Sequence, residues 1–119
     1  MSQEINIITV GLTPRHNCPA ESYIWPENVE NVFDFEGHLK TANEWLTMNV
    51  TFDDGELRDL ENRIHEVRLY LTGLTSLTVA FLNAWAQQHQ ACGATCRLKL
   101  VLMHWDNKKT KYVGQGWQP

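Results

Sequence analysis

The stretch VRLYLTGLTSLTVAFLNAW, Val67 to Trp85, decides the fold because it reads as a strand that runs directly into a helix. The strand part, RLYLTG, ends at Gly73. Beyond it, apolar residues recur at three- and four-residue spacing from Leu74 to Trp85, which predicts a helix. That helix is apolar over a broad face, so we expect it to be mostly buried, with its second side available to another subunit.

The next apolar run predicts a second strand parallel to the first. LKLVLM, Leu98 to Met103, is apolar at nearly every position, as in a strand covered on both faces of a parallel sheet. Strand, helix and strand in this order form a right-handed crossover. The following HWDNKKTKYVGQ predicts a polar turn at Asp106 to Lys109 and a returning strand at Lys111 to Gln115.

The N-terminal half offers one more strand and two more helices. INIITVG, Ile5 to Gly11, predicts a buried strand, and the proline-bearing segment 12–31 predicts an irregular excursion. Apolar spacing in FEGHLKTANEWLTM predicts a short helix. A further helix is predicted from an Asp53–Glu56 capping box and from one apolar stripe, which consists of Leu57, Leu60, Ile64 and Val67.

Size and composition favour a single α/β domain over residues 1–119. A chain of 119 residues has material for one hydrophobic core. The sequence contains no apolar run long enough for a membrane span, and its start lacks the pattern of a secretory signal, so we expect a cytoplasmic protein without membrane contact. Three cysteines (Cys18, Cys92 and Cys96) are an odd number, which argues against a disulfide framework, and their spacing predicts no metal site.

The charges are unevenly placed although the net charge is −4. Most of the acids lie between Glu21 and Glu66, whereas from Val67 onward Asp106 is the only acid among several lysines and arginines. The positive C-terminal half suits a small anionic ligand, or it is simply a solvated hairpin tip. The overall acidity argues against duplex DNA, whose binding requires many neutralised phosphates.

Two Gly-Thr turns follow predicted strands and form a candidate anion site. Parallel strands end at one edge of a sheet, where a glycine lets a ligand approach the backbone and a helix N-terminus favours phosphate. The predicted ligand-binding residues are Gly11, Leu12 and Thr13 in the first turn, Thr72, Gly73, Leu74, Thr75 and Ser76 in the second, and Asp106 at the end of the last parallel strand. The structural alternatives are that Gly73 only permits the turn, that Thr75 or Ser76 caps the helix, and that Asp106 opens the hairpin turn.

The segment from Val67 to Gln115 resembles the small CRISPR-associated proteins with CARF-like Rossmann cores, which include the ring nucleases. The resemblance rests on LYLTGLTS, LTVAFLNAWAQQ, LVLMHWD and KYVGQ. It implies a single Rossmann-like (CARF-like) domain, with a mostly parallel sheet and a C-terminal hairpin. It also implies a homodimer that binds a cyclic oligoadenylate across its two-fold axis in type III CRISPR defence, and that cleaves it if the protein is a ring nuclease. We predict no cofactor, and the sequence does not identify a metal requirement.

In a ring nuclease, the ribose 2′-OH attacks the adjacent phosphorus. The protein then has to align the groups, stabilise charge and move a proton. The candidate catalytic residues are Arg15 for charge, and His16 or His104 for the proton. The alternative function is a non-catalytic module that sequesters the messenger, or one that docks on a protein partner through its apolar helix and acidic middle segment.

Overall fold

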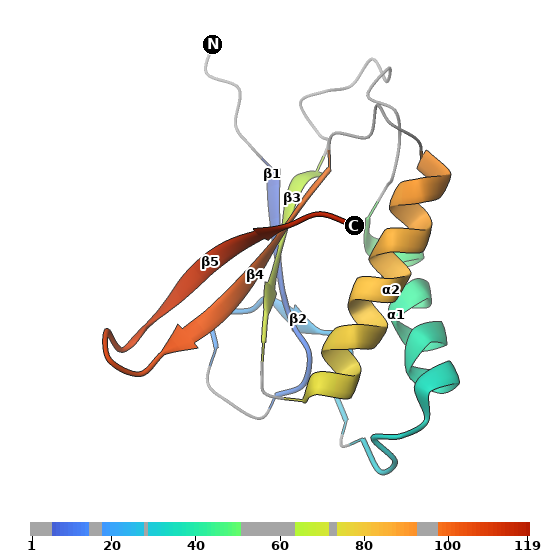
Figure 1. Cartoon of the computed structure of the whole chain (residues 1–119), viewed down its shortest axis with the longest axis horizontal. Coiled ribbons are helices and arrows are strands. Elements are labelled where there is room, and N and C mark those ends of the chain that lie inside the picture. The colour runs from blue at the N-terminus through green and yellow to red at the C-terminus, as the bar shows by residue number, and fades with distance from the viewer. Residues whose placement is uncertain (1–5, 15–17, 28, 51–63, 72–73, 93–97) are drawn as a thin grey trace.

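One mixed sheet of five strands organises the computed structural model, which describes residues 6–14, 18–27, 29–50, 64–71, 74–92 and 98–119 (Figure 1). The strand order is β2-β1-β3-β4-β5. The strands are β1 (Asn6–Gly11), β2 (Ser22–Tyr23), β3 (Ile64–Tyr70), β4 (Lys99–Asp106) and β5 (Lys111–Trp117). Neighbours from β2 to β4 are parallel, and β4 pairs antiparallel with β5. The predicted α/β class, mostly parallel sheet and C-terminal hairpin are confirmed.

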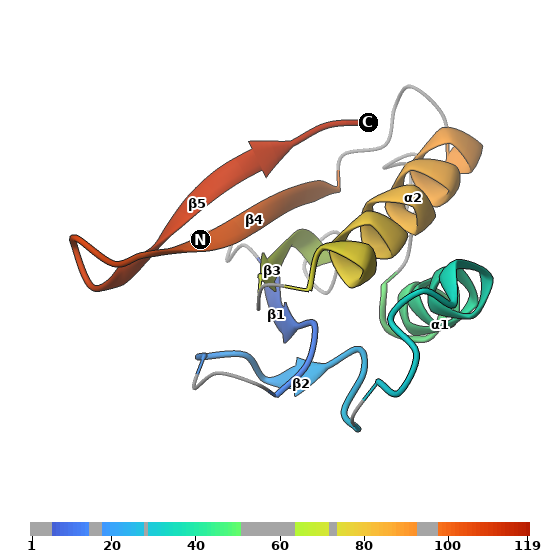
Figure 2. The ribbon, with the colours of Figure 1, turned by 60° about the horizontal axis from the view of Figure 1, so that its bottom comes forward.

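Both helices lie on the same face of this sheet (Figure 2). Helix α1 (Phe35–Asn49) lies between β2 and β3 in the chain, and α2 (Thr75–Cys92) between β3 and β4. These two connections advance across the sheet in the same direction, and right-handed crossovers that advance in one direction place their helices on one face. We call the other face, which neither helix covers, the open face.

The prediction that Leu98 to Met103 is covered on both faces is therefore wrong. Leu100 and Leu102 are buried beneath the helices, whereas Val101 and Met103 on the open face are only half-buried. Apolar residues at nearly every position of a strand did not distinguish full burial from half-burial, because half-buried positions also accept Val and Met.

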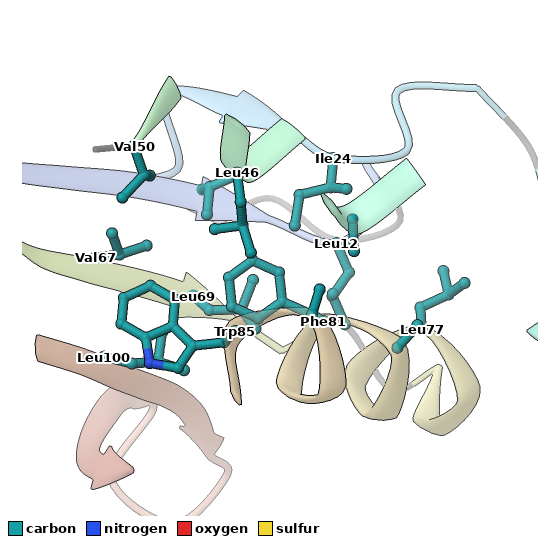
Figure 3. Packing of buried hydrophobic residues seen from close by; sticks show 14 of the residues in the cluster. Leu12, Ile24, Leu46, Val50, Val67, Leu69, Leu77, Phe81, Trp85 and Leu100 are labelled. Carbon is teal, nitrogen blue, oxygen red and sulfur yellow. The ribbon is translucent and has the colours of Figure 1, made fainter. Parts of the chain in front are cut away.

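The hydrophobic core fills the space between the sheet and the helices (Figure 3). Phe81 and Trp85 of α2 stack at 6.1 Å between ring centroids, and Phe81 also meets Trp45 of α1 at 6.4 Å. Gln88 Nε2 donates to the main-chain oxygen of Asn43 at 3.2 Å and to its Oδ1 at 3.1 Å. The broad apolar face of α2 is thus shared between the sheet and α1, which explains its width without a second subunit.

The predicted helix over Phe35 to Met48 is confirmed as α1, whose first turn is capped when Gly37 N donates to Asp34 Oδ1 at 3.2 Å. Neither α1 nor α2 has the length and apolar character that crossing a bilayer requires.

The helix predicted from Asp53 onward is wrong at its C-terminal end, because Ile64 to Val67 belong to β3. Residues 53–63 lie outside the described residues. Within β3, Val67 and Leu69 enter the core, while Glu66 and Arg68, which alternate with them, lie on the open face and form an ion pair of 2.6 Å. This two-residue alternation, together with pairing to β1, outweighed the three- and four-residue spacing of the apolar stripe.

The excursion predicted over residues 12–31 contains a short strand, β2, that the sequence analysis missed. Two residues are too few to show a period. The strand is held by its parallel pairing with β1, through Val10 with Ser22 and Gly11 with Tyr23.

Candidate functional site at the carboxyl edge of the sheet

The carboxyl ends of β1 and β3 lie side by side. Gly11, the last residue of β1, pairs with Tyr70, the last residue of β3. The chain leaves β1 towards β2 and leaves β3 towards β4, which are on opposite sides, so the strand order reverses between these two strand ends. Ligands of open α/β sheets bind at such a reversal, outside the carboxyl ends of the strands. The segments that follow Gly11 and Tyr70 therefore leave the sheet at one edge.

Four of the predicted site residues, Arg15, His16, Thr72 and Gly73, lie outside the described residues. The described part of the second turn begins at Leu71, whose N–H donates to the main-chain oxygen of Met103 at 3.1 Å and so prolongs the ladder between β3 and β4. Leu74, immediately before α2, is half-buried.

In the first turn, the side chains of Leu12 and Thr13 are buried rather than presented to solvent. Leu12 points into the core beside Phe81 and Ile24 (Figure 3). The main-chain oxygens of Gly11 and Leu12 accept N–H groups from Ile24 at 3.0 Å and from Trp25 at 2.9 Å. The start of this turn is therefore anchored to the segment that follows β2.

Gly11 is required by a close approach of Tyr23. A Cβ atom at position 11 would lie 2.7 Å from Tyr23 Cε1 and 3.4 Å from Cys18 Sγ. The side of Gly11 that faces the open face is thus already occupied by a ring of the chain itself.

Helix α2 begins at this same edge with properties that favour an anion. The first helical turn of α2 contains no acidic residue, and in it Thr75 is exposed and Ser76 is half-buried. The N–H groups of a first helical turn have no partner within the helix, and the helix dipole is positive there. Thr78, one turn later, donates both its N–H and its hydroxyl to the main-chain oxygen of Leu74, at 3.1 Å and 3.3 Å.

His104 and Asp106 lie farther out, on the hairpin. Tyr70 with Met103 is the last register pair between β3 and β4, so both residues lie beyond the body of the sheet. His104 Nε2 is 2.8 Å from Gln115 Oε1. Asp106 Oδ1 accepts the N–H groups of Lys108 at 2.9 Å and Lys109 at 3.3 Å, which is the turn-opening role considered as its structural alternative.

Sequence reasoning missed an aromatic cluster on the open face, next to this edge. Tyr70 and Tyr112 meet edge to face at 4.8 Å, and Cys18 Sγ lies 3.7 Å from the hydroxyl of Tyr23. The hydrogen bond with Cys18 raises the pKa of Tyr23, and burial, followed by the nearby Cys18 and Tyr70, raises the pKa of Tyr112. The detectable signal was alternation, since Val67 and Leu69 in the core place Tyr70 on the opposite face.

A hollow lies at the other end of β4. It measures about 1090 Å³ and lies between the second half of α2 and the start of the hairpin, with Trp85, His89, Leu98 and Trp117 among its lining residues. It is thus separate from the edge at which β1 and β3 end. Within the described ranges, no three His, Cys, Asp or Glu side chains gather in a way that would hold a metal ion.

Comparison with known protein families, characterised proteins and solved structures found no match to this chain.

Proposed function

We propose that this chain is a Rossmann-like (CARF-like) domain that binds a cyclic oligoadenylate at the carboxyl edge of its sheet. The observation that carries the proposal is the pairing of Gly11 with Tyr70, which brings the ends of β1 and β3 together at one edge. A ligand at this edge would meet both segments that follow the strands. The identity of the ligand comes from the resemblance of Val67 to Gln115 to the CARF-like proteins.

The proposed phosphate contact is the N-terminus of α2. The N–H groups of its first helical turn and the hydroxyls of Thr75 and Ser76 supply donors, and no carboxylate in that helical turn repels an anion. Arg15 would add a charge-assisted hydrogen bond from the facing turn. Leu12 and Thr13 would contribute through their position rather than their side chains, because both are buried.

Cleavage, if the ligand is turned over, requires in-line attack of a ribose 2′-OH on phosphorus. We assign charge stabilisation to Arg15 and proton transfer to His16, which follow the β1 turn. His104 is the second candidate for the proton, and it would have to exchange its contact with Gln115 for one with the ligand. If these residues do not catalyse cleavage, this protein would bind the messenger and sequester it instead.

The same proposal implies a cytoplasmic homodimer in type III CRISPR defence, because a cyclic ligand with two-fold symmetry suits two copies of one site. The alternative, a non-catalytic module that docks on a protein partner through α2, has less support, because α2 already packs against the sheet and α1.

Thermal shift with cyclic tri-, tetra- and hexa-adenylate tests the binding proposal, and chromatography of the same mixtures detects linear products. The sharpest variant is Thr75→Glu, because an acid in the first turn stabilises the helix but repels a phosphate. The matched control is Asn83→Glu, at an exposed position in the middle of the same helix. We expect Thr75→Glu to abolish the shift and Asn83→Glu to preserve it. A wild-type protein that none of the three rings stabilises would refute the proposal.

A further inference from the structure

The hairpin extends beyond the sheet as a two-stranded arm (Figure 1). We define the arm as residues 104–113, because the pairing of β4 with β3 ends at Met103 while its pairing with β5 continues to Asp106 and Lys111. Its residues are mostly exposed, and it carries charged and aromatic side chains that the proposed function does not use.

Trp105 on this arm is both exposed and held in place. Half of its surface is accessible to solvent (50 %). Its Nε1–H donates to Asn107 Oδ1 at 2.6 Å, and its ring meets Tyr112 at 5.2 Å. Tyr112 in turn packs edge to face on Tyr70 of β3. An exposed ring fixed in this way loses little conformational freedom when a flat ligand stacks on it.

The arm is the positive part of a negatively charged chain. Lys108, Lys109 and Lys111 are all exposed, within four residues of one another. The only acid of the arm, Asp106, already accepts two main-chain N–H groups through its Oδ1. The net charge of the whole chain is −4, so this concentration of lysines does not reflect the general composition.

We propose that the arm binds single-stranded nucleic acid, with a base stacked on Trp105 and neighbouring phosphates on the lysines of the turn. Aromatic platforms beside cationic side chains recognise unpaired bases in this way. A duplex fits less well, because its bases are stacked on one another and three lysines neutralise few phosphates. An acidic peptide would satisfy the lysines but would leave the fixed aromatic ring without a flat partner.

This inference does not rest on the cyclic oligoadenylate proposal. The test uses fluorescence anisotropy with a linear RNA of about a dozen nucleotides, a duplex of equal length and a poly-glutamate competitor, at low and physiological salt. If the arm binds no RNA, the thermal shifts with cyclic oligoadenylates are unaffected. If no cyclic oligoadenylate stabilises the protein, the RNA titrations are unaffected.

We expect Trp105→Ala to weaken binding of the single strand by about 5- to 150-fold, whereas Trp105→Phe keeps most of the affinity. Lys108→Ala and Lys109→Ala should each lower the slope of log affinity against log salt by about 0.7. The matched controls are Phe33→Ala and Lys40→Ala, which remove an exposed aromatic ring and an exposed lysine away from the arm. Both should leave affinity and slope unchanged.

The proposal would be overturned by no binding of the single strand at low salt up to about 100 µM protein, by equal losses in the control and arm variants, or by full displacement by poly-glutamate. The last would identify the arm as a surface for an acidic protein. Preference for the duplex over the single strand would likewise contradict stacking on Trp105.

Discussion

Tyr23 lies so close to Gly11 that a Cβ atom at position 11 would come within 2.7 Å of its ring. Because the two residues are register partners in β1 and β2, this contact helps to hold a strand of only two residues against the sheet. The glycine that the sequence offered as a point of ligand approach thus has a structural role.

We predict that Gly11→Ala destabilises the protein by about 1–3 kcal/mol, the usual cost of overpacking. Urea unfolding measures the change as a lower midpoint at constant slope. The matched control is Gly116→Ala in β5, where an added Cβ meets nothing within 4 Å. Adding Tyr23→Ala to Gly11→Ala should remove the penalty of the alanine. Additive effects of the two substitutions would show that the close approach does not cause the loss.

Thr110 at the tip of the arm adopts φ of 49°, in the left-handed region that a β-branched residue disfavours. We expect Thr110→Gly to stabilise the protein by about 1 kcal/mol, because glycine accepts this conformation without strain. Lys109→Gly, at the preceding position, should be neutral or destabilising, because glycine there only adds freedom to the unfolded chain. If both substitutions shift the urea midpoint in the same direction, this assignment is contradicted.

Stability should fall at alkaline pH through Tyr23 and Tyr112. The pKa of each phenol is raised above its ordinary value of 10.0 in the folded protein, so the unfolded chain loses these protons first. Their contribution is fully present below about pH 10 and is lost as the pH rises through the folded pKa values. Urea unfolding between about pH 8 and 11.5 measures the fall.

Phenylalanine at both tyrosine positions should flatten that pH dependence. Cys18→Ala separates the causes, because Cys18 acts on the pKa of Tyr23 chiefly through a hydrogen bond, which is the largest influence there. On the pKa of Tyr112 it acts only through its charge, which is second to burial. Phenolate absorbance should therefore show a larger downward change in the pKa of Tyr23 than of Tyr112. An unchanged titration in Cys18→Ala would mean that the contact with the thiol does not persist in solution.

The sequence predicted those elements whose patterns are long and unambiguous. The spacing of Leu77, Phe81 and Trp85 gave α2, and Asp106 with its lysines gave the hairpin turn. It mispredicted the residues around Ile64, where a stripe of helical spacing overlaps a strand, and it could not find β2, which exists only through its partner strand.

For the candidate site, sequence order was enough to predict that β1 and β3 end at one edge. It did not predict which side chains the turn presents, since the burial of Leu12 depends on Ile24 and Phe81, which are distant in the chain. The aromatic cluster was missed for the same reason. Tyr70 and Tyr112 meet only because β4 lies between β3 and β5 and fixes the register of both.

The last prediction concerns Val79 and Phe81, which are near neighbours on α2 but face different surroundings. Val79 is 49 % exposed, whereas Phe81 is fully buried against Trp45 and Trp85. We expect Phe81→Ala to cost about 3–5 kcal/mol of stability and Val79→Glu to cost less than about 0.5 kcal/mol. Light scattering on Val79→Glu should give the same mass as the wild type, because the broad apolar face of α2 is used within the chain. A wild-type dimer that Val79→Glu converts to a monomer would instead place the subunit interface on the outer surface of this helix.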